Sequence, residues 1–180
     1  RHQLQFLATH DVLTELVNRR ELVSTVTTLL GNEPRTGRNV ALLFIDLDGL
    51  KQVNDTFGHG VGDEVIVEVA RRIRGEVRES DTVARFGGDE FVVVLPRIHT
   101  VEDAERLAEK IQNALASPVI VDGVGVHVSL SIGIAVATPG EDADEALRRA
   151  DAALYQAKRG GRAQTIVDEA RARGLDLSVP

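Results

Sequence analysis

The chain has 180 residues, of which 43% are hydrophobic and 27% charged, and its net charge is −7. This composition fits one globular domain with a sizeable core, and the acidic balance disfavours a nucleic-acid polymer or an anionic membrane as a partner. Cysteine is absent, which excludes disulfides, thiolate zinc sites and a cysteine nucleophile. No apolar run approaches about 18 residues and no signal peptide is visible, so we expect no membrane contact from this segment.

The first half of the chain alternates between helical and extended patterns. Residues 2–30 are predicted to be helical because Leu and Val recur every three or four positions, with Asp11 as a candidate cap. Residues 31–37 form a turn-rich loop. The apolar run at residues 40–47 predicts a central strand covered on both faces. Residues 49–62, rich in Gly, Asn, Asp and His, are predicted to be a ligand-facing loop, and residues 63–77 an amphipathic helix.

Residues 78–95 have the pattern of a β-hairpin. Residues 82–86 and 91–95 are its predicted strands, and Gly87-Gly88 is predicted to supply the positive φ of a two-residue turn. Two carboxylates, Asp89 and Glu90, stand at the tip between apolar strands. Taken alone, they are better explained as a solubilising acidic turn.

The second half predicts a helix, further strands and a last helix. Thr100 and Asp103 form a capping box before a helix that Pro118 stops. Asp122-Gly123 is predicted to turn the chain between residues 119–121 and a long alternating strand at 125–136. A final helix at 143–158 ends at Gly160-Gly161, and residues 164–167 are predicted to be an edge strand.

This order of elements predicts an α+β fold with a mainly antiparallel sheet, in the ferredoxin-like palm arrangement. In such a palm the first strand and the hairpin are neighbours, so Asp46 and Asp89 are expected to converge. Two carboxylates with a backbone carbonyl between them are oxygen ligands that Mg²⁺ prefers. Asp48, two residues after Asp46, is interpreted as a residue that structures the loop.

Five ordered sequence blocks resemble the GGDEF domain, the catalytic domain of diguanylate cyclases. They are Gly87-Gly88-Asp89-Glu90-Phe91, D-V-L-T-E-L-V-N-R-R (11–20), F-I-D-L-D-G-L-K-Q-V-N-D-T-F-G-H-G-V-G-D (44–63), S-I-G-I-A (131–135) and A-D-A-A-L-Y-Q-A-K-R-G-G-R (150–162). The resemblance implies the palm of nucleotidyl cyclases. It divides the chain into the end of a helical connector (1–9), a GGDEF catalytic domain (10–167) and a tail or linker (168–180).

The resemblance also implies a reaction, in which two GTP molecules condense into cyclic di-GMP and two pyrophosphates. Asp46, Asp89 and the carbonyl of Leu47 would hold Mg²⁺ or Mn²⁺. Asp89 would also assist deprotonation, Glu90 would be a second acidic contact, and Lys51 would act at the phosphates. The alternative function is a non-catalytic module that binds GTP or cyclic di-GMP.

The same resemblance assigns the substrate contacts. Asn54 and Asp63 would recognise guanine, and His59 would line the nucleotide pocket. The phosphates would be bound by the backbone N–H groups of residues 48–50, which include Leu50, and by Lys51, Lys158 and Arg162. Other interpretations stay open: Asp63 as a helix N-cap, Asn54 as a turn residue, and Lys158 as a cation complementing a helix C-terminus.

A second ligand site is implied by Arg78 and Asp81, which match the R-x-x-D site where the product inhibits the family. On their own, the two residues are better explained as a solvated pair at a helix end. Catalysis implies a two-fold homodimer, because each domain carries one GTP site. The chain departs from the common family pattern at Val17, Leu50 and Ala163, none of which carries metal-binding, base-recognising or phosphate-binding chemistry in its side chain.

The chain begins at Arg1 and contains no methionine. We therefore expect a piece of a longer protein that is cytoplasmic or forms the cytoplasmic part of a larger, membrane-bound one.

Overall fold

The computed structural model describes residues 2–31, 39–138 and 140–168. Its elements, in order, are α1 (His2–Thr9), β1 (Val17–Asn18), α2 (Arg19–Gly31), β2 (Asn39–Asp48), α3 (Leu50–Phe57), α4 (His59–Glu76), β3 (Thr82–Gly87), β4 (Glu90–Ile98), α5 (Val101–Ala114), β5 (Val119–Val121), β6 (Val124–Val126), β7 (Ser129–Ala137), α6 (Ala143–Arg159) and β8 (Thr165–Val167). Most of the predicted 31–37 loop and of the predicted tail lies outside the described residues.

A six-stranded sheet in the order β1-β3-β4-β2-β7-β8 forms the middle of the molecule. β2 pairs antiparallel with β4 and β7, β3 pairs antiparallel with β4, and only the outer pairs β1–β3 and β7–β8 are parallel. Every residue of β2 is buried, as expected of a central strand. The predicted α+β palm with a mainly antiparallel sheet is confirmed.

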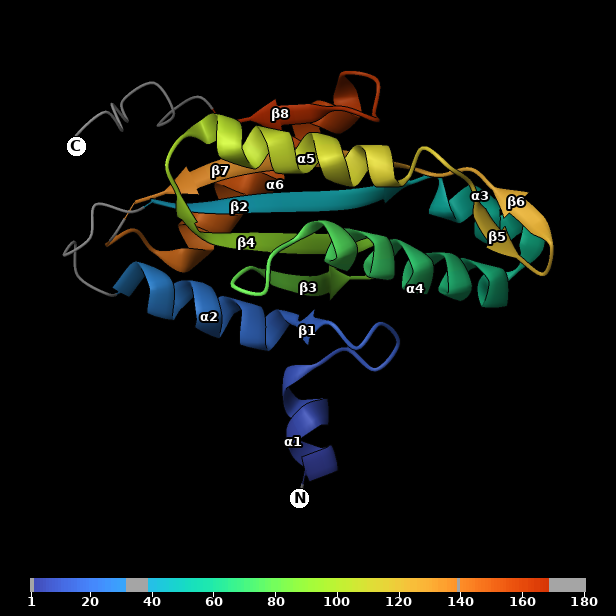
Figure 1. Ribbon diagram of the computed structural model, residues 1–180, viewed down its shortest axis with the longest axis horizontal. Coiled ribbons are helices and arrows are strands. Elements are labelled where there is room, and N and C mark those ends of the chain that lie inside the picture. Colours follow the sequence, from blue (N-terminus) through green and yellow to red (C-terminus); the bar gives the residue numbers. More distant parts are fainter. Residues whose placement is uncertain (1, 32–38, 139, 169–180) are drawn as a thin grey trace.

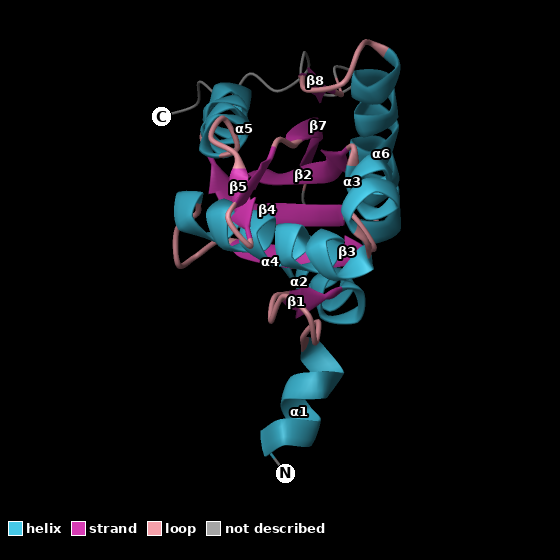
Figure 2. Ribbon diagram, turned by 90° about the vertical axis from the view of Figure 1, so that its right-hand side faces the viewer, coloured by secondary structure: helices cyan, strands magenta, loops and turns pink. Residues whose placement is uncertain are grey.

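Helices cover both faces of the sheet (Figure 2). Leu43 and Ile45 of β2 pack in one core with the apolar faces of α4 and α5, and Leu42 and Phe44 pack in a second core with α2 and α6. This alternation follows from the two-residue period of a strand, and the continuous apolar run of β2 supplies both faces.

The packing of α6 on β7 depends on Gly133. A Cβ atom at this position would lie 2.1 Å from the Leu154 nitrogen and 2.3 Å from the Ala150 oxygen, both in the backbone of α6. Only glycine permits this close approach of helix and strand. Gly133 therefore sets how near α6 lies to the sheet.

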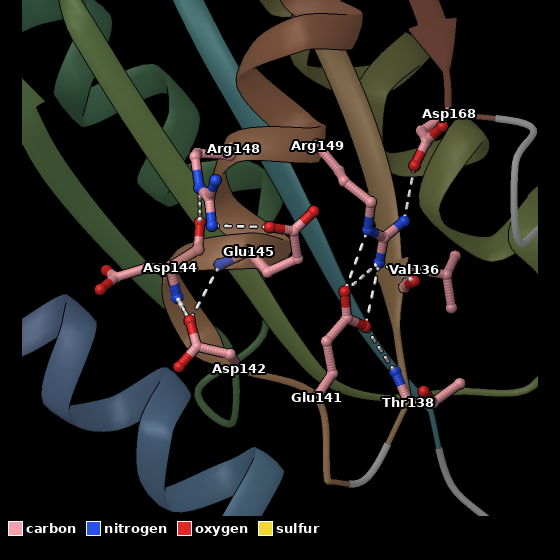
Figure 3. Close-up of polar contacts among 9 residues, drawn as sticks. All are labelled: Val136, Thr138, Glu141, Asp142, Asp144, Glu145, Arg148, Arg149 and Asp168. Carbon is pink, nitrogen blue, oxygen red and sulfur yellow. Dashed lines mark hydrogen bonds and ion pairs between the residues drawn. The ribbon is translucent and has the colours of Figure 1, made fainter.

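Arg149 fastens three segments at one end of α6 (Figure 3). Its largely shielded guanidinium donates to the carbonyl of Val136 at 2.8 Å, and it forms ion pairs with Glu141 at 2.8 Å and Asp168 at 2.6 Å. Charge-assisted hydrogen bonds of this kind are stronger than neutral ones. They join the end of β7 to Asp168, the residue directly after β8.

The predicted helix at residues 2–30 is wrong between residues 10 and 18. α1 ends at Thr9, and the chain then turns back so that β1 pairs with Ala84 and Arg85 of β3 before α2 begins. Asp11 caps this turn, not a helix, by accepting hydrogen bonds from the N–H and hydroxyl of Thr14. The apolar residues of the turn recur with a helical period, which led to the wrong prediction. The hydrogen bonds from Thr14 to the side chain of Asp11 stabilise a turn in place of the helix.

The predicted ligand-facing loop at residues 49–62 is also wrong, because α3 and the start of α4 occupy it. Gly49 (φ 84°) and Gly58 (φ 90°) separate these helices from β2 and from each other. Leu50 and Val53 are buried in the core and give α3 its apolar side. The glycines mark helix ends here, where left-handed backbone is needed.

The hairpin exists, but its turn differs from the prediction. β3 extends to Gly87 and β4 begins at Glu90, so Gly88 and Asp89 connect them, and neither glycine has a positive φ. An irregularity in the ladder between Arg85 and Gly87 turns the strand instead.

Predictions for the later elements are largely confirmed. The capping box at Thr100 is present, the Asp122-Gly123 turn has positive φ values, and α6 ends before Gly160. Two details are wrong: α5 ends at Ala114, ahead of Pro118, and the long strand is divided into β6 and β7.

α1 projects away from the sheet and its covering helices (Figures 1 and 2). Among the described residues, no helix combines the length and apolar character that crossing a bilayer requires.

Candidate active site

The end of β2 and the tip of the β3–β4 hairpin, which carry Asp46, Asp89 and Glu90, meet at one end of the sheet, where these strands end. We call this end of the sheet the acidic edge. Asp46 of β2 lies opposite Glu90 of β4 in the antiparallel register, and the N–H of Leu47 donates to the carbonyl of Asp89 at 3.0 Å. The arrowheads of β2 and β3 point to this edge, on the side of α3 (Figure 1). The predicted convergence of Asp46 with the hairpin tip is therefore present.

Burial and neighbouring charges raise the pKa of two carboxyl groups at this edge, Asp46 and Glu90. Asp46 is 4% exposed, and its burial together with the charges of Asp89 and Glu90 raises its pKa to about 6, although a hydrogen bond from Lys158 opposes the shift. Burial also raises the pKa of Glu90, with further contributions from Asp151 and Asp89. A bound cation would relieve this repulsion.

Lys158 comes to the site from α6 and pairs with Asp46. It stands in the last turn of that helix, where a cation also complements the helix dipole. Its ammonium nevertheless reaches across to the end of β2, so that it neutralises part of the negative charge there.

The oxygen donors at the edge fit a hard divalent cation. They are the carboxylates of Asp46 and Asp89 and the carbonyl of Leu47, which is the ligand chemistry of Mg²⁺ or Mn²⁺. Within the described ranges, no group of three or more His, Cys, Asp or Glu side chains is placed to hold a metal ion. A cation at this edge would therefore need the two carboxylates together with backbone oxygen.

Asn54 and Asp63 lie on α3 and α4, on either side of a tight contact. A Cβ atom on Gly62 would lie 1.8 Å from Oδ1 of Asn54, so the amide rests directly against this glycine. That Oδ1 is buried and has no hydrogen-bond partner in the described part of the chain. A buried acceptor without a donor is costly, and a ligand N–H would satisfy it.

The structural alternatives for Asn54 and Asp63 are wrong. Asp63 is exposed and lies inside α4, which begins at His59, so it is not the N-cap. Asn54 lies inside α3 and is not a turn residue. His59 is exposed at the first position of α4.

The other residues predicted to bind the phosphates differ in the solvent exposure of their side chains. Lys51 on α3 and Arg162 after α6 are exposed. The side chain of Leu50 is buried in the core, so only its backbone is available to a ligand.

Asp48 has the structural role expected for it. Its buried carboxylate accepts hydrogen bonds from Ser131 at 2.9 Å, Ser129 at 2.9 Å and the N–H of Ala163 at 3.2 Å. It thereby joins β2, β7 and the segment after α6. The two serines were not predicted as partners, although Ser131 belongs to the S-I-G-I-A block.

Arg78 and Asp81 form a compact turn before β3. The N–H of Arg78 donates to Oδ2 of Asp81 at 2.9 Å, and the N–H of Asp81 donates to the carbonyl of Arg78 at 3.0 Å. Arg78 is exposed. The turn lies at the start of β3 and the acidic edge at its other end. At about 3.3 Å per residue, the length of β3 separates the two by about 20 Å.

The chain is similar to known proteins of one family. The model of the family described as "Diguanylate cyclase, GGDEF domain" matches residues 8–164. The bifunctional diguanylate cyclase/cyclic di-GMP phosphodiesterase MucR of Pseudomonas aeruginosa is 45% identical over 157 residues, which cover 87% of this chain and 23% of MucR. The diguanylate cyclase TpbB of Pseudomonas aeruginosa is 44% identical over 157 residues, covering 86% of this chain and 36% of TpbB.

A solved structure extends the similarity to the fold. The coiled coil and GGDEF domain of DgcB from Caulobacter crescentus, in complex with cyclic di-GMP, superposes with a TM-score of 0.86 at 31% identity, over 92% of this chain and 88% of that one. The chain therefore belongs to the GGDEF domain family of diguanylate cyclases. It spans about a quarter to a third of the length of MucR and TpbB.

Proposed function

We propose that this chain is a diguanylate cyclase domain that condenses two GTP molecules into cyclic di-GMP and two pyrophosphates. The observation that carries the proposal is the meeting of Asp46 and Asp89 at one sheet edge, with the signature Gly87-Gly88-Asp89-Glu90-Phe91 at the hairpin. Membership of the GGDEF family supports the same reaction.

In each of two equivalent steps, a 3′-oxygen bonds to the α-phosphorus of the other nucleotide. The bond from that phosphorus to the oxygen bridging to the β-phosphate breaks, and pyrophosphate leaves with the electron pair. Asp46, Asp89 and the Leu47 carbonyl would hold Mg²⁺ or Mn²⁺, which when bound lowers the pKa of the 3′-hydroxyl and stabilises charge on the phosphate. Asp89 assists removal of the 3′-hydroxyl proton, and Glu90 provides a second acidic contact.

The other site residues bind and orient GTP. Asp63 accepts from the N1–H and N2 amine of guanine, and Asn54 addresses the opposite edge of the base. His59 lines the same pocket. Three cations and the backbone N–H groups of residues 48–50 offset the phosphate charge. Lys51 and Arg162 are exposed, and Lys158 is partly buried beside Asp46.

The reaction requires two copies of the chain. One GTP site per domain means that the two nucleotides react only when two domains face each other about a two-fold axis. We propose residues 10–167 as the catalytic domain and α1 as the end of a connector that brings two domains together. Residues 168–180 would be a tail or linker. Because GTP is its proposed substrate, we propose that the domain is cytoplasmic or is the cytoplasmic part of a larger protein.

Product binding at Arg78 and Asp81 would limit the reaction. The exposed guanidinium of Arg78 can pair with a phosphate or with the guanine edge of cyclic di-GMP, and Asp81 can accept from guanine. The site would lie apart from the acidic edge, so its occupation would act on catalysis indirectly.

The test is nucleotide analysis after incubating the 180-residue chain at high concentration with GTP and Mg²⁺. We expect cyclic di-GMP and pyrophosphate in a ratio of one to two, and a loss of about a hundredfold or more in Asp89→Asn. Asp122→Asn is the matched control, since Asp122 also stands at a hairpin tip but far along the chain from the site. GTP binding by calorimetry without turnover would favour the non-catalytic module, and full turnover by Asp89→Asn would refute the assigned role.

A further inference from the structure

One arginine joins the signature turn to the turn that follows α1. Arg85 of β3 donates from Nη2 to the carbonyl of Gly88 at 2.8 Å and from Nε to the same oxygen at 3.2 Å. Its Nη1 donates to Oδ1 and Oδ2 of Asp11 at 3.2 and 3.3 Å. The guanidinium therefore bridges a backbone carbonyl at the tip and a carboxylate that is remote in sequence.

Asp11 is itself held firmly. Its Oδ1 accepts from the N–H of Thr14 at 2.9 Å and from the hydroxyl of Thr14 at 2.8 Å, and its own N–H donates to Leu16 at 2.7 Å. The pairing of β1 with β3 fixes the turn against the sheet. Asp11 is thus a rigid anchor for Arg85.

The ion pair is largely shielded from water. The side chain of Arg85 is 15% exposed and that of Asp11 is 25% exposed. Shielded, charge-assisted hydrogen bonds orient their partners more strongly than exposed surface pairs do. The pair is therefore suited to fixing geometry.

The carbonyl that Arg85 binds belongs to the peptide between Gly88 and Asp89. A peptide unit is planar, so orienting this carbonyl also orients the N–H of Asp89 and restricts its backbone. Gly88 has no side chain to hold it, and a Cβ atom there would meet nothing within 4 Å. Without Arg85, the backbone at the tip would have the freedom of an unpacked glycine.

We propose that Asp11 is a positioning residue for the metal-binding tip. It holds Arg85 so that Arg85 orients the Gly88–Asp89 peptide, and with it the carboxylate of Asp89. The effect on catalysis rests on the proposed function, whereas the effect on the tip does not.

The Leu47 N–H reports the position of the tip directly, because it donates to the carbonyl of Asp89. The first measurement is amide hydrogen exchange by NMR on the 180-residue chain, without nucleotide or metal. Asp11→Asn keeps an oxygen for Thr14 but removes the charge, and it should speed exchange at Leu47 by about tenfold. Glu15→Gln removes a charge from the same turn at an exposed residue and should leave that rate unchanged.

A second variant guards against poor folding of the first. Arg85→Gln should give the same increase at Leu47, and the double variant should add nothing further, because both residues act through one contact. With GTP and Mg²⁺, Asp11→Asn should lower kcat by about tenfold while KM for GTP stays within about twofold. It should also raise the Mg²⁺ concentration needed for half-maximal rate.

Unchanged exchange at Leu47 in both single variants would overturn the proposal. An equal rise at the amides of β7 would also overturn it, since that would assign Asp11 a general structural role. If the unmodified chain does not turn over GTP, the proposed function fails and the exchange result still decides the role of Asp11.

Discussion

Lys158 at the end of α6 donates a hydrogen bond to Asp46 at the end of β2, across 112 positions of sequence. The contact places a cation beside the most deeply buried carboxylate of the candidate site. It also fixes the end of α6 over that edge of the sheet. Lys158 therefore serves stability and charge balance as well as its proposed role at the phosphates.

Replacing Lys158 with Met should destabilise the chain by about 1 kcal/mol, because the pair is only partly shielded. Losing the cation raises the pKa of Asp46 beyond about 6. Below about pH 6 both folded proteins hold this carboxyl neutral, so this effect of Lys158→Met should be absent there. It should grow as the pH rises through about 6 and be complete above the higher pKa of the variant. Urea unfolding at several pH values measures it.

Arg159→Met is the control for Lys158→Met. Arg159 is the next residue of α6, is exposed, and lies over the ring of Tyr155 without an ion pair to Asp46. Turnover should fall about tenfold or more in Lys158→Met and stay within about twofold in Arg159→Met. Equal stability and rate in the two variants would contradict the role of Lys158.

The contact between Gly62 and Asn54 predicts a selective effect on GTP binding. Gly62→Ala would place a methyl group 1.8 Å from the present position of Asn54 Oδ1, so the amide must move. We expect KM for GTP to rise about tenfold with little change in thermal stability. Gly60→Ala, in the same glycine-rich block, meets nothing within 4 Å and should leave KM unchanged. An equal rise of KM for GTP in Gly62→Ala and Gly60→Ala would argue against a specific role for Asn54.

Sequence alone was sufficient to predict the meeting of Asp46 and Asp89, because strand order in a palm makes β2 and β4 neighbours. The partner of Asp46 could not be predicted, since the reach of Lys158 depends on where α6 crosses the sheet. The residues at 49–62 were misread because their glycines separate two short helices. The Asp11–Arg85 pair escaped prediction because the apolar residues around Asp11 have a helical period, although the chain turns there.

Arg78→Ala should weaken inhibition by cyclic di-GMP without altering early turnover. The side chain of Arg78 is exposed, and the Asp81 carboxylate is held by the backbone of the same turn, so the substitution leaves the turn intact. We expect the inhibition constant to rise about tenfold or more, as a charge-assisted contact is lost. Arg74→Ala, an exposed cation in the last turn of α4, is the control. An identical inhibition curve for Arg78→Ala and the unmodified chain would exclude this site.

The close packing at Gly133 predicts a large loss of stability. Gly133→Ala forces α6 away from β7, and we expect a loss of about 3 kcal/mol in the free energy of unfolding. Gly75→Ala should have the opposite sign, with a gain of up to about 1 kcal/mol, because Gly75 lies in α4 and its Cβ would meet nothing within 4 Å. Chemical denaturation of both variants tests the pair. A neutral Gly133→Ala would show that α6 can shift without cost.

Glu68 on α4 predicts part of the acid sensitivity of the fold. It accepts hydrogen bonds from Arg71 and Arg72. Arg72 in turn donates to the carbonyl of Ala114 at the end of α5 and to those of Ser117 and Pro118 just after it. The hydrogen bond from Arg71, followed by that from Arg72, lowers the pKa of Glu68 from 4.5 to about 2 against the effect of burial. The lowered value means that the folded state stabilises the ionised form. This contribution is complete above pH 4.5 and disappears as the pH falls towards 2.

Glu68→Gln should therefore lower the free energy of unfolding by about 1 kcal/mol at pH 7, a value kept small because solvent screens the pair. The difference from the unmodified chain should shrink below pH 4.5 and vanish near pH 2. Glu64→Gln, one turn earlier on α4 and exposed, should show no such dependence. Urea unfolding between pH 2 and 7 measures all three proteins. If the difference in the free energy of unfolding between Glu68→Gln and the unmodified chain stays constant from pH 2 to 7, Glu68 stabilises the fold through packing and not through its charge.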